Sequence, residues 1–301
     1  MNLEKLENII NNNLKNKNIE AKRVFHGRGN FYDDFSYLTV DSLDSILFAT
    51  FYEENLLEKE IISVLEKLAK KLLFEGFIIQ RKYKDSEFFE AVLGDIPNNF
   101  FVVENGLKFK IDFKNRNIGL FFDMKNTREY LKNISKDKAI LNLFSYTCAF
   151  SVVSIFGGAS KVINIDMGKN SLSIGRENHQ LNNLDTKNVK FLAHNILKSF
   201  GKIKSLSPFD IIIIDPPSFQ KGSFVATKDY EKIIKRVGDF TKKGSLVFAC
   251  LNDPFLKTSY LINLFEEFAP DFKYVKRVEN TKEFISNSDE NGLKVLIFEK
   301  I

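Results

Sequence analysis

The sequence contains no tryptophan, two cysteines and three histidines among its 301 residues. Cys148 and Cys250 lie far apart without metal-ligand spacing, which argues against a zinc site or a disulfide framework and fits a reducing cytoplasm. No run approaches the roughly eighteen apolar residues of a membrane-spanning helix. The charged N-terminal residues lack the apolar core of a signal peptide.

Glycine-rich phosphate loops are also missing. The predicted strand near residue 140 runs into Asn142 to Ser151 without a glycine, and Gly157 and Gly158 follow only at the far end of the next helix. A dinucleotide-binding turn needs glycines there so that the backbone can approach the pyrophosphate. A nucleotide-dependent oxidoreductase is therefore a distant alternative.

The chain does contain enough apolar residues for a sizeable core and a surplus of positive charge. Its 44% hydrophobic content suits one large or two medium domains. The net charge of +5 is compatible with a polyanionic partner, although a lysine-rich composition also marks an ordinary solvated surface.

Residues 1–117 have the pattern of a small α+β domain that contacts the substrate or RNA. Helical spacing is found over 3–17 and 56–73, and β-rich runs cover 35–41, 45–52 and 76–83. Asn105-Gly106 predicts a hairpin over 100–113. The candidate nucleic-acid contacts here are basic or aromatic: Arg23, Arg28, Phe31, Arg81, Lys82, Tyr83, Lys84, Lys108, Lys110, Lys114 and Arg116.

Residues 118–301 alternate strands and helices from residue 138 onward. The predicted strands are 139–144, 161–166, 189–193, 210–215 and 245–250, and the predicted helices are 149–156, 168–183, 196–204, 227–242 and 257–268. This alternation predicts an α/β fold with five parallel strands and helices on both faces. Residues 272–279 and 293–300 have no helix between them and are expected to pair antiparallel at the sheet edge.

Polar residues follow the ends of these strands. Asp215 ends the run PFDIIIIDPPSFQKG, where two prolines stiffen the turn. Asp166 suits the two hydroxyls of a ribose, and Asn195 suits the edge of an adenine, although a helix cap and a turn are the plain alternatives. Because open α/β sheets bind ligands beyond the carboxyl ends of their strands, we expect these groups to converge on one crevice.

At these residues the chain resembles a family, the bacterial 23S ribosomal RNA methyltransferases that act on cytosine-5 or guanine-7, with class I, S-adenosylmethionine-dependent, Rossmann-like folds. GLFFDMKNTREY (119–130) is similar to the family's G-x-[FY]-x-D-Q-R-x-x-R, and NLFSYTCAF is similar to N-x-F-S-Y-T-G-G-F. DPPSF is similar to D-P-P-x-F, and HGRGNFYDDFSYLTVD is similar to the opening of the family's middle domain. A member without the separate N-terminal RNA-binding module is expected.

The resemblance implies S-adenosyl-L-methionine as cofactor and a set of residues that touch it: Asp123, Arg128, Phe144, Ser145, Tyr146, Thr147, Asp166, Asn195 and Asp215. The sequence also departs from the family pattern: Cys148 and Ala149 stand where the family has two glycines, and Asn195 stands where it has an aspartate. A side chain at Cys148 is expected to crowd the methionine portion of the cofactor if the turn keeps the family's path.

Three residues are the catalytic candidates. Cys250, in VFACLND, is similar to the cysteine of the family's T-F-S-C-S segment and is a candidate nucleophile toward a pyrimidine, with buried packing as the alternative. Asp215 is expected to hydrogen-bond the edge of the target base. Phe219 offers it a stacking face or packs in the core. Lys221 is a candidate phosphate contact.

The expected function is methylation of an RNA base, most directly in ribosomal RNA, in the cytoplasm and without a metal or a membrane. One alternative is a non-catalytic RNA- or cofactor-binding relative. Another is a methyltransferase for a protein or a small molecule. The target nucleotide, the methylated atom and the choice between monomer and homodimer stay open.

Overall fold

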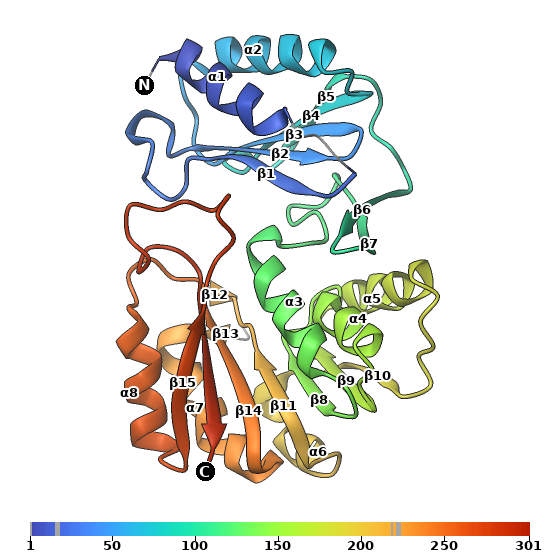
Figure 1. Ribbon diagram of the computed structural model, residues 1–301, viewed down its shortest axis with the longest axis vertical. Coiled ribbons are helices and arrows are strands. Elements are labelled where there is room, and N and C mark those ends of the chain that lie inside the picture. Colours follow the sequence, from blue (N-terminus) through green and yellow to red (C-terminus); the bar gives the residue numbers. More distant parts are fainter. Residues whose placement is uncertain (1, 16–18, 218, 221–223) are drawn as a thin grey trace. The chain divides into compact units, whose positions relative to one another are not determined.

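The computed structural model describes residues 2–15, 19–217, 219–220 and 224–301 (Figure 1). The chain divides into two compact units. Unit 1 comprises Met1–Asp123 and Thr281–Ser288, and unit 2 comprises Met124–Asn280 and Asp289–Ile301. The division falls after Asp123 rather than at the expected 117/118 boundary, and a segment between the last two strands joins unit 1. No helix in the described part of the chain is long and apolar enough to cross a membrane.

Unit 1 is built on a five-stranded sheet in the order β1-β2-β3-β4-β5. Only β3 and β4 are parallel, because α2 crosses between them. Helices α1 and α2 cover one face of this sheet (Figure 1), and their apolar stripes pack on it. The bounds are α1 Leu3–Leu14, β1 Lys22–His26, β2 Leu38–Leu43, β3 Ile46–Phe51, α2 Glu58–Lys71, β4 Gly76–Arg81 and β5 Phe89–Leu93.

The predicted hairpin of unit 1 is confirmed. β6 (Phe100–Glu104) pairs antiparallel with β7 (Leu107–Ile111) around Asn105 and Gly106. Both turn residues have positive φ, 49° and 77°, as a tight two-residue hairpin turn demands. The short strands β1 and β5 were not predicted, because charged residues interrupt their apolar pattern.

Unit 2 contains a seven-stranded sheet in the order β10-β9-β8-β11-β14-β16-β15. The first five are parallel, and β16 pairs antiparallel with both β14 and β15. This confirms the predicted α/β fold with a parallel sheet and an antiparallel C-terminal pair. The bounds are β8 Ala139–Leu143, β9 Lys161–Asp166, β10 Val189–Ala193, β11 Phe209–Ile214, β14 Thr241–Leu251, β15 Phe272–Val278 and β16 Lys294–Lys300.

Helices cover both faces of the sheet in unit 2 (Figure 1). Alternate strand residues such as Leu143, Ile214 and Ala249 form one core with α6, α7 and α8. On the other face α4 and α5 pack on β8 to β10, and α3 packs on α4. The bounds are α3 Lys125–Ile134, α4 Ala149–Phe156, α5 Lys169–Leu181, α6 Phe200–Lys204, α7 Ala226–Val237 and α8 Thr258–Phe268.

Several element predictions for unit 2 need correction. Helix α3 was not predicted, although residues 119–130 were singled out as a motif. The expected helix 196–204 is a 3-10 turn, η3 (Ile196–Lys198), followed by α6. The expected helix 227–242 ends at Val237 and continues as η4 (Gly238–Phe240), so β14 begins at Thr241. A small pair, β12 (Phe219–Gln220) with β13 (Phe224–Val225), lies after β11.

Candidate active site at the carboxyl edge of the unit 2 sheet

The carboxyl ends of four parallel strands meet in one row of unit 2. Three neighbouring Cα pairs fix this row: Ile165 with Leu143, Leu143 with Ile214, and Ile214 with Ala249. The residue after each of these positions therefore lies at or beside the same carboxyl edge of the sheet, with Asp166 and Cys250 still paired to the neighbouring strand on their other side. Those residues are Asp166, Phe144, Asp215 and Cys250. The structure thus brings the predicted strand-end groups of unit 2 together.

Asp166 links the turns that follow β8 and β9. Its carboxylate oxygens accept hydrogen bonds from the backbone N–H groups of Tyr146, at 2.9 Å, and Gly168, at 2.7 Å. Each carboxylate oxygen has two lone pairs, so one per oxygen remains for a further donor. The geometry suits the two vicinal hydroxyls of a ribose, and the bond from Gly168, the residue before α5, also fits the helix-capping alternative.

In the turn after β8, every second residue from Phe144 to Cys148 has a positive φ. Phe144, Tyr146 and Cys148 have φ values of 57°, 45° and 60°, in the left-handed region that favours glycine. Cys148 also precedes α4 as its N-cap residue. The family glycine at this position is therefore explained by backbone conformation, and a cysteine here adopts the same conformation at an energetic cost.

The Cys148 side chain is fully buried beneath this turn. Its Sγ lies 3.8 Å from the Ser145 hydroxyl, and burial raises the pKa of the thiol to about 12. A Cβ built on Gly175 of α5 would lie 2.5 Å from Sγ and 2.9 Å from the Cys148 Cβ. The missing side chain at Gly175 is the space that holds the thiol. The thiol is therefore packed against α5, and its effect on the cofactor stays a prediction.

A buried polar chain supports α4 and α5 below the turn. His179 Nδ1 donates to the Gly175 carbonyl at 2.7 Å, and its Nε2 accepts from the Ser151 hydroxyl at 3.0 Å. Ser151 in turn accepts from Asn164 on β9, which accepts from Asn142 on β8. Burial lowers the pKa of His179, so the ring is neutral and this donor order is fixed. This series of hydrogen bonds ties Gly175 to β8 and β9.

Asn195 follows β10 and has a capping role. Its Oδ1 accepts from the Lys198 N–H at 3.2 Å, and its Nδ2 lies 3.7 Å from the Met167 sulfur. Met167 is 47% exposed directly after Asp166. Sequence reasoning missed Met167, although an apolar residue next to the acidic strand end was the available signal. An exposed thioether beside an amide suits the apolar face and polar edge of an adenine.

The remaining cofactor candidates fall in different parts of the chain. Ser145 and Thr147 are buried in the turn, where the Thr147 carbonyl accepts from Asn178 at 3.0 Å. Arg128 is buried on α3, with 2% of its surface exposed. Asp123 is the last residue of the first segment of unit 1.

Tyr230 of α7 joins the ends of β11 and β14 and was not predicted. Its hydroxyl lies 3.0 Å from the carbonyl oxygen of Cys250 and 3.2 Å from that of Ile214, and donates one hydrogen shared between them. Burial, with Cys250 and Asp215 nearby, raises the pKa of this phenol well above its usual value. Cys250 itself is buried and not part of a disulfide, while Asp215 is half-buried.

Two sequence candidates after Asp215 are not placed. The side chain of Phe219 lies outside what the structure describes, as does the whole of Lys221. Among the residues that are described, no group of three or more His, Cys, Asp or Glu is arranged to hold a metal ion.

Three of the basic candidates in unit 1 are engaged in ion pairs: Arg23, Arg81 and, 3.4 Å from Asp85, the more exposed Arg116. Arg23 is buried against Asp41 at 2.5 Å, so its prediction as a nucleic-acid contact is wrong. Arg81 pairs with Glu58 at 2.7 Å and Glu90 at 2.8 Å and is mostly buried. Arg28 and Lys84 are exposed.

The β6–β7 hairpin presents an aromatic and basic outer face. Phe101 pairs across the hairpin with Lys110, and Val103 pairs with Lys108, so these four side chains share one face. Phe101 is 40% exposed, and the Lys108 ammonium lies 4.9 Å from the centre of its ring. The opposite face of the hairpin is buried.

Comparisons with known proteins agree with this architecture. Residues 22–299 match the family model described as S-adenosylmethionine-dependent methyltransferase. A Bacillus subtilis relative, "Putative ribosomal RNA large subunit methyltransferase YwbD", is 29% identical over 310 residues, with 93% of this chain and 74% of the relative covered. Ribosomal RNA large subunit methyltransferase K/L of Pseudoalteromonas translucida is 28% identical, with 93% of this chain but 42% of the relative covered.

A solved structure gives the same result at the level of the whole fold. The crystal structure of SMU.776, "a putative methyltransferase complexed with SAH", has a TM-score of 0.88 and 25% identity, with 99% of this chain and 80% of that chain covered. A Methanocaldococcus jannaschii tRNA methyltransferase, with a TM-score of 0.62 and 17% identity, shares the fold.

Proposed function

We propose that this chain, which belongs to the S-adenosylmethionine-dependent methyltransferase family, methylates a base of RNA, with ribosomal RNA as the substrate. The observation that carries the proposal is the family match over residues 22–299, joined to relatives named as ribosomal RNA large subunit methyltransferases. Such a substrate lies in the cytoplasm, where the free thiols of Cys148 and Cys250 stay reduced.

The residues of the carboxyl edge fit S-adenosyl-L-methionine, which supplies an electrophilic methyl group on its sulfonium. We assign Asp166 to the ribose hydroxyls, because its two oxygens are oriented by backbone donors and each keeps a lone pair. Asn195 and Met167 are assigned to the adenine. The turn Phe144, Ser145, Tyr146 and Thr147 is assigned to the methionine portion, because it follows β8 in the strand-end row and the Cys148 thiol is buried against α5 rather than exposed.

Asp123 and Arg128 are proposed as cofactor contacts only on the ground of their place in the 119–130 motif.

Asp215 is assigned to the target base. It follows β11 and lies between Phe144 and Cys250 in the strand-end row. Methyl transfer depends mainly on holding the nucleophile in line with the methyl group, and a carboxylate at this position can orient the base for that. A stacking face at Phe219 and acceptors for an amino group in the DPPSF segment stay predictions from the sequence, because Ser218 and the Phe219 side chain lie outside the described part of the chain.

Cys250 decides between two routes. For methylation at cytosine-5, its thiolate adds to carbon 6 of the ring and makes carbon 5 nucleophilic, and it is expelled after carbon 5 has taken the methyl group and lost its proton. For methylation at nitrogen, no covalent step is needed and Cys250 is a packing residue. Both routes use the same cofactor site and the same Asp215.

The outer face of the β6–β7 hairpin supports RNA as the polymer. An exposed Phe101 flanked by Lys108 and Lys110 offers a ring for a base and ammonium groups for phosphates. Affinity for RNA is therefore expected to fall steeply as salt rises. Salt-insensitive activity on a protein or a small molecule is the competing outcome.

The direct test is to incubate the protein with tritiated S-adenosyl-L-methionine and total RNA from a strain that lacks it. We expect label in large-subunit ribosomal RNA, and nucleoside mass spectrometry then gives the methylated atom. Cofactor binding without label in RNA would favour a non-catalytic relative, and absence of cofactor binding at millimolar concentration would refute the enzyme.

A further inference from the structure

Phe255 stands out among the apolar side chains of unit 2 because 91% of its surface is exposed. It lies in the segment 252–257, which leaves the carboxyl end of β14 just after Cys250 and leads into α8. A single exposed apolar side chain is ordinary on a protein surface, so the place of this one matters more than its exposure: it lies on a loop that follows the strand end carrying Cys250.

This ring is held in place by its own loop. The Phe255 N–H donates to the Asp253 carboxylate at 2.8 Å, which closes a tight turn around Pro254. The Asp253 carbonyl accepts from the Lys294 ammonium at 2.9 Å. These two hydrogen bonds therefore hold the segment 252–257 in place.

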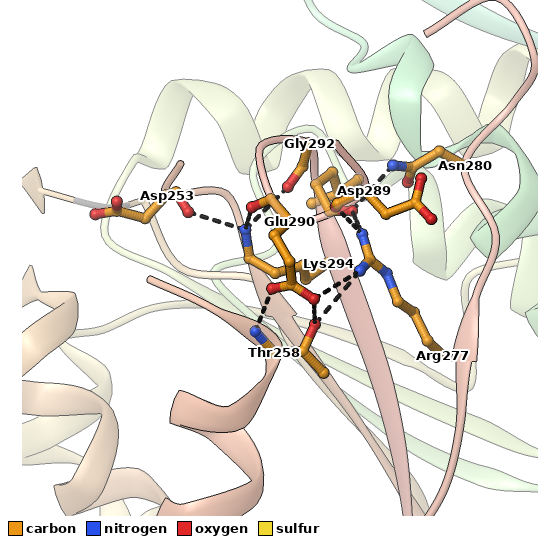
Figure 2. A network of polar contacts seen from close by, with 9 residues as sticks. Asp253, Thr258, Arg277, Asn280, Asp289, Glu290, Gly292 and Lys294 are labelled. Atoms are coloured by element: carbon orange, nitrogen blue, oxygen red, sulfur yellow. Dashed lines mark hydrogen bonds and ion pairs between the residues drawn. The ribbon is translucent and has the colours of Figure 1, made fainter. Parts of the chain in front are cut away.

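Lys294 anchors the loop from the first position of β16 (Figure 2). It is fully buried, and its ammonium donates to three carbonyls, those of Asp253, Glu290 and Gly292, at 2.9, 2.7 and 3.0 Å. Lys294 also pairs with Leu251 across the β14–β16 ladder. The ammonium thus ties the end of β14 to the start of β16.

Glu290 fixes the far end of the same loop (Figure 2). Its carboxylate accepts from both the N–H and the hydroxyl of Thr258, at 2.6 and 2.7 Å, where α8 begins. Arg277 lies 3.6 Å from Glu290 and donates to the carbonyls of Asp289 and Leu293. With both ends of 252–257 held, the exposure of Phe255 is built into the fold.

We infer that Phe255 is a stacking platform for an unpaired RNA base next to the target nucleotide, and that the Lys294 and Glu290 network positions it. The inference rests on the proposed function. A base that enters the site leaves its stack, so its neighbours lose stacking partners and an exposed ring at the rim replaces one. Lys257, two residues later in the same segment, is exposed and offers a positive charge for a nearby phosphate.

The absence of tryptophan makes a direct test available. The variant F255W carries a single tryptophan at the rim. F156W is the matched control, because Phe156 is also an exposed phenylalanine, with 55% of its surface exposed at the end of α4. Two residues later the Gly158 carbonyl accepts a hydrogen bond from the N–H of Asp137, just before β8 begins. Phe156 therefore lies at the opposite, amino edge of the same sheet.

Stacking predicts that polycytidylic acid quenches the fluorescence of F255W and leaves F156W unchanged. Heparin, a polyanion without bases, is expected to quench neither. Equal quenching of both variants, quenching by heparin, or no quenching of F255W would overturn the inference. A change in F255W fluorescence with protein concentration alone would do the same, because it would assign the ring to a contact between copies.

Kinetics separate this inference from the proposed function. F255A is expected to raise KM for RNA about tenfold while the Kd for S-adenosylhomocysteine stays that of the wild type, and F156A is expected to change neither. Wild-type protein that transfers no label to RNA refutes the proposed function. Active wild type with an unchanged F255A refutes the stacking role alone.

Discussion

Gly175→Ala is expected to disturb the cofactor turn from below, because the new methyl group would meet the Cys148 side chain. The built Cβ lies 2.5 Å from Sγ, 2.9 Å from the Cys148 Cβ and 3.4 Å from the Thr147 carbonyl oxygen. The first two distances are overlaps in a buried site, and overpacking of this kind costs about 1–3 kcal/mol. An alanine inside α5 also gains about 1 kcal/mol of helix propensity over glycine, which offsets part of that cost.

The effect of Gly175→Ala on the free energy of unfolding is expected to change sign when Cys148 is first replaced by glycine. In Cys148→Gly the thiol is absent, so Gly175→Ala meets only Thr147 at an ordinary contact distance and keeps the gain in helix propensity. We therefore expect Gly175→Ala to lower the free energy of unfolding of the wild type by about 1 kcal/mol and to raise that of Cys148→Gly by about 1 kcal/mol. The coupling between the two sites is then about 2 kcal/mol.

The assay is urea unfolding of the four proteins of this cycle, followed by calorimetric titration with S-adenosylhomocysteine. The Kd is expected to rise about tenfold in Gly175→Ala, equivalent to about 1.4 kcal/mol, and to recover in the double variant. A Gly175→Ala change that is equally favourable in both backgrounds would refute the packing argument. Lost stability with an unchanged Kd would separate the turn from cofactor binding.

Three further outcomes follow from the geometry. The pKa of His26 is lowered to about 3 by burial and by Arg23, so between pH 6.5 and that value only the unfolded chain binds a proton at His26. The free energy of unfolding should therefore fall by about 1.4 kcal/mol for each pH unit below 6.5. Urea unfolding should show a shallower fall of this free energy with pH in His26→Gln. Cys250→Ala should abolish label transfer if the target is cytosine-5, and undiminished transfer would exclude a thiolate adduct. Tyr230→Phe leaves two strand-end carbonyls without their donor and should cost about 1–2 kcal/mol in urea unfolding, with a change below about 0.5 kcal/mol counting against the bridge.

The parallel sheet was predictable because its strands carry their signal locally. Ile211 to Ile214 form an apolar run closed by Asp215 and two prolines, and the strand appears as Phe209–Ile214. Asn105-Gly106 likewise encodes its own turn through two positive φ values. Patterns of this kind depend on residues close together in the chain, so sequence alone reveals them.

The buried polar partners were not predictable, because they join residues far apart in sequence. Arg23 lies in a charged-looking stretch and was taken for a surface residue, but Asp41 on the neighbouring strand buries it. The fate of the Cys148 thiol depends on Gly175 of α5 in the same way. Lys294, in an apolar strand, also gives no local sign that three carbonyls surround it.

The measurement that tests the central claim most directly is single-turnover transfer of tritium from S-adenosyl-L-methionine to ribosomal RNA, by the wild type and by Asp166→Ala in parallel. The wild type is expected to label the RNA. Asp166→Ala is expected to be slower by about two orders of magnitude at the same cofactor concentration, because it loses the carboxylate that orients the ribose. Unlabelled RNA with the wild type, or equal rates for the two proteins, would contradict the assignment of the carboxyl edge as the methyl-transfer site.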